Sequence, residues 1–494
     1  MRSLLALFVS VTVSLAISAS ASELTPLEMR GREIFMHGSS KSGEITASID
    51  GGITRLPGST FPCATCHGRD GRGRSEGGVQ PSNITPAALA RPYESATFSG
   101  RRHGPYDARS LKRAITLGFD PAGNVLDTAM PRYAMSQSDF DALRAYMGKL
   151  GSEHDPGVSE TTLRLGVILP PRATMQQASD ETRAVLQAWF NEVNRRGGVY
   201  GRNIELAFVD AAGTAAERAE QVAKFIDDAG VFALVSSFTE GAEREIADVV
   251  EAKQIPLVTS LASNPRSSVA PGMYVREMFA GLAEQARALV RVAARSGTKG
   301  KRAAVVSSDP RLTSVRDAAA EALRVAGYSI DDARALRDND VVLFLDEGLL
   351  REFHKNGAGE TLTLVPASLA GPDIFTSSGA RALLSFPTLP RDWSEDALKL
   401  RARLAAEREI GRSHPAAQFA ALASAALTVD ALARTGRALG RDGFLETIDQ
   451  TRKYTSGFAP PLTFRRDRHL GSTGAYVIYL DGAEHGAPEW IDTE

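Results

Sequence analysis

Short apolar segments alternate with amphipathic helical segments from about residue 162 onward, and this alternation restricts the possible folds more than any other feature of the chain. Apolar strand segments at 163–169, 204–210, 232–238 and 255–261 are separated by helical segments at 181–198, 215–230 and 243–253. The helical segments repeat apolar residues at three- and four-residue steps. This order predicts a parallel sheet with helices on both faces.

A second series of the same kind follows, with strand segments at 303–308, 341–347 and 361–367 and helical segments at 316–327 and 349–357. Two series in one chain predict two α/β lobes. Because parallel sheets bind ligands at the carboxyl ends of their strands, we expect a small-solute site in a cleft between the lobes.

The two-lobed region resembles the type I periplasmic substrate-binding proteins of the branched-chain amino-acid transporter family. The likeness covers about residues 160–484, from LRLGVILP through SSFTEG and IPLVTSLASNP to SGFAPPLTFRRDRHLGSTGAYVIYL. In that family, loops after two first-lobe strands hold the polar end of the ligand. The resemblance therefore implies ligand contacts from Ser237, Thr239, Gly241, Ser260 and Ala262, although Thr239 is equally well placed to cap a helix.

Two departures from the family pattern put amino-acid specificity in doubt. Glu240 stands where a ligand carboxylate would bind, and its charge would oppose that carboxylate. After AAVVSSDP the family has an aromatic-glycine pair, whereas this chain has the sequence RLTS at 311–314. Asp346 and Glu347 follow a strand, and they are either ligand contacts for a cationic or hydroxylated solute or solvated loop charges.

The N-terminal part contains the only cysteines of the chain, Cys63 and Cys66, followed directly by His67. Thiols at this spacing can form thioethers to the two vinyl groups of a porphyrin, and the adjacent imidazole can then bind the iron. The motif thus predicts one covalently attached haem c. A C-x-x-C dithiol is the alternative, but a glycine-rich loop follows the motif in place of the βαβ context that a thioredoxin requires.

Helical segments flank this motif, one around residues 27–38 and one at 136–150. In the second, Ser136 with Asp139 forms a capping signal, and the apolar stripe comprises Phe140, Leu143, Met147 and Leu150. Leu27, Ile34 and Phe35 of the first segment are expected to pack against it.

Residues 27–150 resemble a class I c-type cytochrome domain, a small all-α fold. The resemblance implies Met130 as the distal iron ligand, with Met135, Met147 and His103 as competitors and an ordinary core methionine as the other interpretation of Met130.

The chain begins with Arg2, an apolar run of about 14 residues and the small-residue sequence around Ala19 and Ala21. This pattern predicts a secretory signal peptide over 1–21, cleaved near Ala21, and a periplasmic protein; a membrane anchor is the alternative. The expected domains are 1–21, the cytochrome domain at 22–150, a polar linker at 151–161 and the two-lobed domain at 162–494.

Formal net charge is only −2, with no basic blocks, so nucleic-acid binding is not expected, nor is a membrane span after cleavage. No catalytic motif is present, so we do not expect an enzyme, and lone histidines such as His354, His414 and His469 are interpreted as structural or solvated. The leading hypothesis is an exported mono-haem electron carrier with a fused solute-binding domain. Its redox partner would be a dehydrogenase, for example of the quinoprotein type, or an oxidase. The alternatives are a transporter's solute-binding protein or a ligand or redox sensor.

Overall fold

The computed structural model divides the chain into two compact units, residues 1–153 and 154–494, and each is described by itself. The boundary falls at the start of the polar segment 151–161. The signal-peptide prediction lies outside the residues that the structure describes, which are 24–49, 54–73, 81–94, 100–151, 154–262, 264, 273–295, 301–331, 335–370, 381–408, 410–411, 413–437, 439–481 and 484–493.

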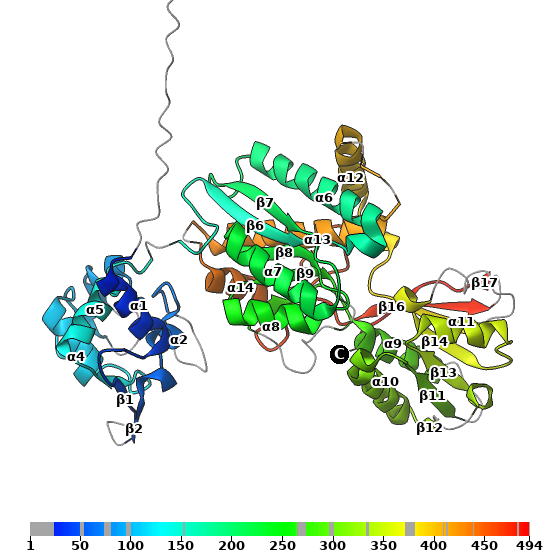
Figure 1. The fold of residues 1–494 in the computed structure, drawn as a ribbon, viewed down its shortest axis with the longest axis horizontal. Helices are drawn as coiled ribbons and strands as arrows, with labels where there is room; N and C mark the ends of the chain where they lie inside the picture. The colour runs from blue at the N-terminus through cyan, green and yellow to red at the C-terminus, as the bar shows by residue number, and fades with distance from the viewer. Residues whose placement is uncertain are drawn as a thin grey trace, which may run out of the picture. The chain divides into compact units, whose positions relative to one another are not determined.

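Two crossing helices form the centre of the first unit (Figure 1): α1 (Pro26–His37) and α5 (Gln137–Met147). Ser136 caps α5 by accepting a hydrogen bond from the backbone N–H of Asp139, as the sequence predicts. The predicted stripe of α5 is buried, as are Ile34 and Phe35 of α1. Leu27 is 45% exposed, so the prediction that it packs against α5 is wrong.

The first unit is not all-α as expected. Three short strands, β1 (Thr46–Ile49), β2 (Thr54–Pro57) and β5 (Arg132–Ala134), form an antiparallel sheet in the order β2-β1-β5. Strands β3 (Tyr93–Glu94) and β4 (Arg102–His103) pair separately. These strands are too short to show a period in the sequence. The remaining helices are α2 (Cys63–His67), α3 (Pro86–Leu89) and α4 (Ala108–Leu117).

The first lobe of the second unit is built on a parallel five-stranded sheet in the order β10-β9-β8-β6-β7. Its strands are β6 (Thr162–Ile168), β7 (Asn203–Val209), β8 (Ala233–Phe238), β9 (Leu257–Leu261) and β10 (Val275–Arg276). The connecting helices are α6 (Arg172–Arg195), α7 (Ala215–Ala229) and α8 (Glu243–Lys253). One apolar core joins the sheet to α6, and another joins its opposite face to α7 and α8, which confirms the predicted parallel sheet with helices on both faces.

The second lobe has a sheet in the order β12-β11-β13-β14-β15-β16-β17, with β18 also paired to β16. The strands from β12 to β15 are parallel, and β16 runs antiparallel to β15. They comprise β11 (Arg302–Val306), β12 (Ser329–Ile330), β13 (Val341–Phe344), β14 (Leu362–Pro366), β15 (Arg381–Phe386), β16 (Ala475–Asp481), β17 (Glu484–His485) and β18 (Glu489–Ile491). Helices α9 (Leu282–Arg295) and α10 (Thr313–Val325) contribute to one core, and α11 (Glu347–Lys355) contributes to another.

The chain passes between the lobes after β10, after β15 and again before β16. Between the last two passages it adds α12 (Glu395–Arg408), α13 (Pro415–Thr435) and α14 (Arg441–Asp449), whose apolar residues join the core of the first lobe (Figure 1). Helix α13 is long and apolar enough to cross a membrane, but 78% of its most apolar window is buried in the unit. In this structure α13 is therefore a core helix of the first lobe.

Candidate functional site

The expected solute site lies at the carboxyl ends of the strands, where loops of the first and second lobes meet. The loop after β8 begins with Thr239, the loop after β9 with Ala262, and the loop after β11 leads into a short 3-10 helix, η4 (Pro310–Leu312). Parallel strands place all of these loops at one edge of each sheet.

Ser237 does not face this edge with a free hydroxyl. The residue is completely buried in β8, its Oγ accepts a hydrogen bond from the backbone N–H of Ile168 at 3.1 Å, and it donates to the carbonyl of Val235 at 3.1 Å. The first hydrogen bond joins β8 to β6, and the second lies within β8. Ser237 is thus used by the sheet in this structure.

Thr239 and Gly241 lie in the loop between β8 and α8. Thr239 is buried, and its carbonyl accepts from the N–H of Ala242 at 2.9 Å. Helix α8 begins only at Glu243, with Ala242 as its N-cap, so Thr239 does not cap it. Gly241 has φ +79°, a left-handed conformation that favours glycine, and it is exposed.

Ser260 is part of β9, and its side chain lies outside the described part of the chain. Ala262, half-buried, follows the strand, and the described residue beyond it is Asn264. The contribution of this loop to a ligand site stays a prediction, and the described polar side chain in the loop is that of Asn264.

In the second lobe, the acidic residues after β13 have structural partners. Asp346 caps α11 by accepting from the N–H of Leu349 at 2.9 Å, and it also accepts from the hydroxyl of Ser308. These hydrogen bonds, that of Ser308 first, lower the pKa of Asp346. Glu347 is exposed and pairs with Arg351 one helical turn later. Glu347 therefore has the environment of a solvated surface charge, the second of the two alternatives given for it.

Among the described residues of these loops, Arg311 of the second lobe is hydrogen-bonded to Gly241 and Asn264 of the first lobe, and Glu243 binds the same two residues. The Glu243 carboxylate accepts from the backbone N–H of Gly241 at 2.9 Å and from that of Asn264 at 3.1 Å. Arg311 of the second lobe donates to the Gly241 carbonyl at 3.4 Å, and the Asn264 amide donates to the Arg311 carbonyl at 3.3 Å.

Arg311 is held in place by its own lobe. Its guanidinium forms a two-point ion pair with Asp309, with Nη2 2.6 Å from Oδ2 and Nε 3.0 Å from both carboxylate oxygens. The hydrogen bond to Asp309 is the main reason that the pKa of Arg311 is raised, and Glu243 and Glu245 contribute. Sequence reasoning detected the departure RLTS that contains Arg311, but it did not assign the residue a role.

Arg218, near the start of α7, is a buried cation next to these loops. It is 5% exposed, and its Nη1 donates to the carbonyl of Glu240 at 2.6 Å. Its Nε and Nη2 have no hydrogen-bond partner among the described residues, although Glu243 and Glu240 lie close enough to act on its charge. Burial lowers the pKa of Arg218. No motif in the sequence marks this position.

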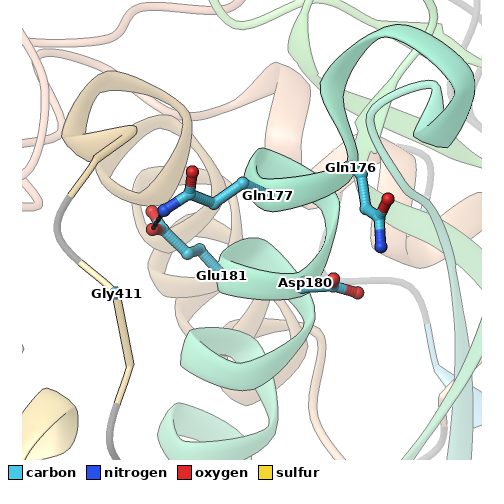
Figure 2. A pocket seen from close by; sticks show the side chains of 5 residues that line it. All are labelled: Gln176, Gln177, Asp180, Glu181 and Gly411. Atoms are coloured by element: carbon cyan, nitrogen blue, oxygen red, sulfur yellow. Dashed lines mark hydrogen bonds between the residues drawn. The ribbon is translucent and has the colours of Figure 1, made fainter.

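A depression of about 380 Å³ lies beside the first half of α6, lined by Gln176, Gln177, Asp180, Glu181 and Gly411 (Figure 2). Figure 2 shows the side chains of Gln177 and Glu181 turned toward one another, and the Gln177 amide donates to Glu181 at 3.2 Å. None of the predicted ligand residues lines this depression, and no sequence motif predicts it.

In the first unit, Cys63, Cys66 and His67 lie on the single turn of α2. Burial raises the pKa of Cys63 to about 12, which disfavours the reactive thiolate that a redox dithiol needs. His67 Nδ1 lies 2.9 Å from the carbonyl oxygen of Ser82, and burial lowers the pKa of His67. Met130 is half-buried and packs against the apolar core of this unit, as an ordinary core methionine does.

The competitors of Met130 have other environments. Met147 is 5% exposed in the core stripe of α5, and Met135 packs partly buried against the same core. His103 stacks on Tyr93, with ring centroids 5.1 Å apart. Among the described residues, no group of three or more His, Cys, Asp and Glu side chains gathers as metal ligands.

Comparison with known proteins identifies the fold of the second unit. A family model described as periplasmic binding protein matches residues 162–336. A fatty acid ABC transporter substrate-binding protein from Thermomonospora curvata is 16% identical with a TM-score of 0.55, over 69% of this chain and 95% of that one. The chain is also similar to a leucine-binding protein from Thermotoga maritima, with 16% identity and a TM-score of 0.53 over 67% of this chain and 99% of that one. A third similar structure is a branched-chain amino acid ABC transporter protein from Thermus thermophilus with bound valine, with 16% identity and a TM-score of 0.53 over 68% of this chain and 97% of that one. No curated protein matches the chain.

The second unit therefore has the two-lobed α/β fold of type I periplasmic binding proteins, as the sequence predicts. Proteins of this class typically work in the periplasm, where they bind small solutes and interact with transporter components; they are not enzymes. The expectation that the chain is not a catalyst agrees with this class.

The same comparisons overturn the leading functional hypothesis. The protein family and the solved structures that match are periplasmic binding proteins, a class that has no haem. The predictions of haem c on Cys63 and Cys66, of iron ligation by His67 and Met130, and of electron transfer with a redox partner are therefore corrected. The alternative hypothesis, a transporter's solute-binding protein, is the one that the comparisons favour.

Proposed function

We propose that this chain is the solute-binding protein of an ABC transporter and that residues 154–494 capture a small solute between their lobes. The observation that carries the proposal is the meeting of the strand-end loops. Gly241 and Asn264 of the first lobe contact Arg311 of the second, at the edge where parallel sheets bind ligands. The similar proteins support it, because their names describe binders of leucine, valine and fatty acid for such transporters.

Export is the second part of the proposal. A protein that delivers a solute to a membrane transporter has to reach the periplasm, and residues 1–21 have the composition of a cleaved secretory signal. The intact mass of the protein recovered from the periplasm tests this directly. We expect the mass of a chain that starts at Ser22, and a protein that retains residues 1–21 would contradict the cleavage.

Solute binding is tested with the purified mature chain against a metabolite panel that spans amino acids, amines, polyols, sugars and fatty acids. A ligand at about 100 times its Kd stabilises the folded state by about 2.7 kcal/mol, so thermal unfolding is a sufficient first readout. Calorimetry then gives the Kd. We expect one class of solute to bind and its uptake to be lost in cells that lack the gene. Failure of the whole panel, with uptake unchanged, would reject the proposal.

A further inference from the structure

The Glu243 carboxylate binds backbone donors from two loops of the first lobe. Its carboxylate oxygens accept one hydrogen bond from the loop after β8, at Gly241, and one from the loop after β9, at Asn264. Hydrogen bonds from backbone N–H groups to a carboxylate are charge-assisted and strong, so the two loops together bind an anion. The carboxylate in that site belongs to the protein itself.

The two positive groups near this carboxylate, Arg311 and Arg218, both have acidic neighbours within the chain, although Nε and Nη2 of Arg218 have no hydrogen-bond partner among the described residues. Arg311 of the second lobe contacts the loop after β8 but is paired with Asp309. The charges of Arg311 and Glu243 also attract one another. Arg218 is influenced by both Glu243 and Glu240. A second carboxylate entering here would meet Glu240 and Glu243, and the nearby guanidinium groups already have acidic neighbours.

We propose that Glu243 is a specificity-determining residue that fills the carboxylate subsite from within, so that the cleft takes neutral or cationic solutes without a free carboxylate. This inference rests on the proposed function, because it concerns the chemical class of the solute. Arg311, from the RLTS segment that stands in place of the aromatic-glycine pair, contacts the loops that bind the Glu243 carboxylate. Free amino acids and fatty acids would then be excluded, and their amides, alcohols or amines would not be.

The experiment compares the mature wild-type chain with Glu243→Ala, using the standard amino acids and octanoate as carboxylate probes. At about 1 mM probe, we expect no thermal stabilisation of the wild type. Removing the carboxylate of Glu243 frees the N–H groups of Gly241 and Asn264, and we expect at least one probe to gain ten-fold or more in affinity. Glu245→Ala is the matched control on the same helix and should behave as the wild type does.

Two results would overturn the inference. One is micromolar binding of any carboxylate probe to the wild type, a measurement that does not depend on whether Glu243→Ala folds. The other is a folded Glu243→Ala protein, checked by circular dichroism, that gains no affinity for any probe. Carboxylate binding by the wild type would still support a solute-binding function, whereas the proposed function itself fails only if solutes of every class fail to bind.

Discussion

Arg276 is an arginine buried almost completely, with 1% of its surface exposed, at the point where the chain leaves the first lobe. Its Nε and Nη2 donate to the two carboxylate oxygens of Asp449 at 2.6 and 2.7 Å. Its Nη1 donates to the carbonyls of Met273 and Val275 and lies 3.2 Å from Nδ1 of His469. His469 is 7% exposed, so of the two interpretations given to it, structural or solvated, the structural one applies.

Replacement of Arg276 alone should strongly destabilise the second unit. Arg276→Met would leave the Asp449 carboxylate buried without its counter-charge, and we expect a loss of about 3–5 kcal/mol in the free energy of unfolding. Urea unfolding at pH 7 measures the loss. The double variant Arg276→Met, Asp449→Leu has neither charge of the pair, so we expect it to recover about half or more of the lost free energy of unfolding. A double variant as unstable as the single one would contradict this explanation.

At the scale of elements, α13 begins at a carboxylate supplied by another helix. Glu181 of α6 is 4% exposed, and it accepts from the backbone N–H groups of Ser413 at 3.2 Å and His414 at 3.1 Å and from the Gln418 amide at 2.6 Å. A negative charge at a helix N-terminus is favourable because the first N–H groups have no partner within the helix. Glu181 thereby joins α6 to the central helix of the lobe.

This arrangement predicts a pH-dependent stability. Burial raises the pKa of Glu181, but the donors from His414, Ser413 and Gln418 together lower it below its usual value of 4.5. Because the folded-state pKa is depressed, the stabilisation is fully present above the unfolded value and is lost as the pH falls through the folded value. Glu181→Gln should therefore lose roughly 2–4 kcal/mol at pH 7 and should depend less on pH below 4.5.

Urea unfolding of the second unit between pH 3 and 7 measures both effects. Asp180→Asn is the matched control, because Asp180 is adjacent in sequence but forms only a surface ion pair with Arg172. An acid dependence that is equally steep in Glu181→Gln and in the wild type would show that other groups cause it.

The elements could largely be predicted from the sequence, and the reason is periodicity. Strands β6, β8 and β13 are buried apolar runs, and α8 begins and ends at the predicted residues, 243 and 253. Interactions between distant positions leave no such signal: Glu181 caps a helix more than 230 residues away. Very short strands such as β1 also show no periodic pattern of apolar residues in the sequence.

The candidate site was predicted less well, for related reasons. The resemblance points to the loops after β8 and β9, and their role in ligand binding stays a prediction. The polar groups that meet there include Asn264 and Glu243, which were not predicted. Glu243 reads as an ordinary acidic residue in the first turn of a helix. The haem prediction rested on the pentapeptide C-x-x-C-H, which is short enough to occur by chance, and on the order of the flanking helical segments and Met130.

At the scale of the whole molecule, each of the two units has its own apolar core. The core of the first unit consists of residues between 34 and 150, and the cores of the second unit lie between 163 and 491. A compact unit with its own core can in general unfold cooperatively by itself. We therefore expect two transitions when the full chain is heated in a calorimeter.

Gly31→Ala should identify the transition of the first unit. A Cβ atom at Gly31 would lie 1.9 Å from the Ala142 carbonyl oxygen, so α1 and α5 would have to separate, at a cost of about 1–3 kcal/mol. We expect one transition to fall by roughly 5 °C while the other stays in place. Gly43→Ala, which meets only a side-chain oxygen at 3.8 Å, is the control. A single transition, or a shift of both transitions by Gly31→Ala alone, would show that the two cores unfold as one.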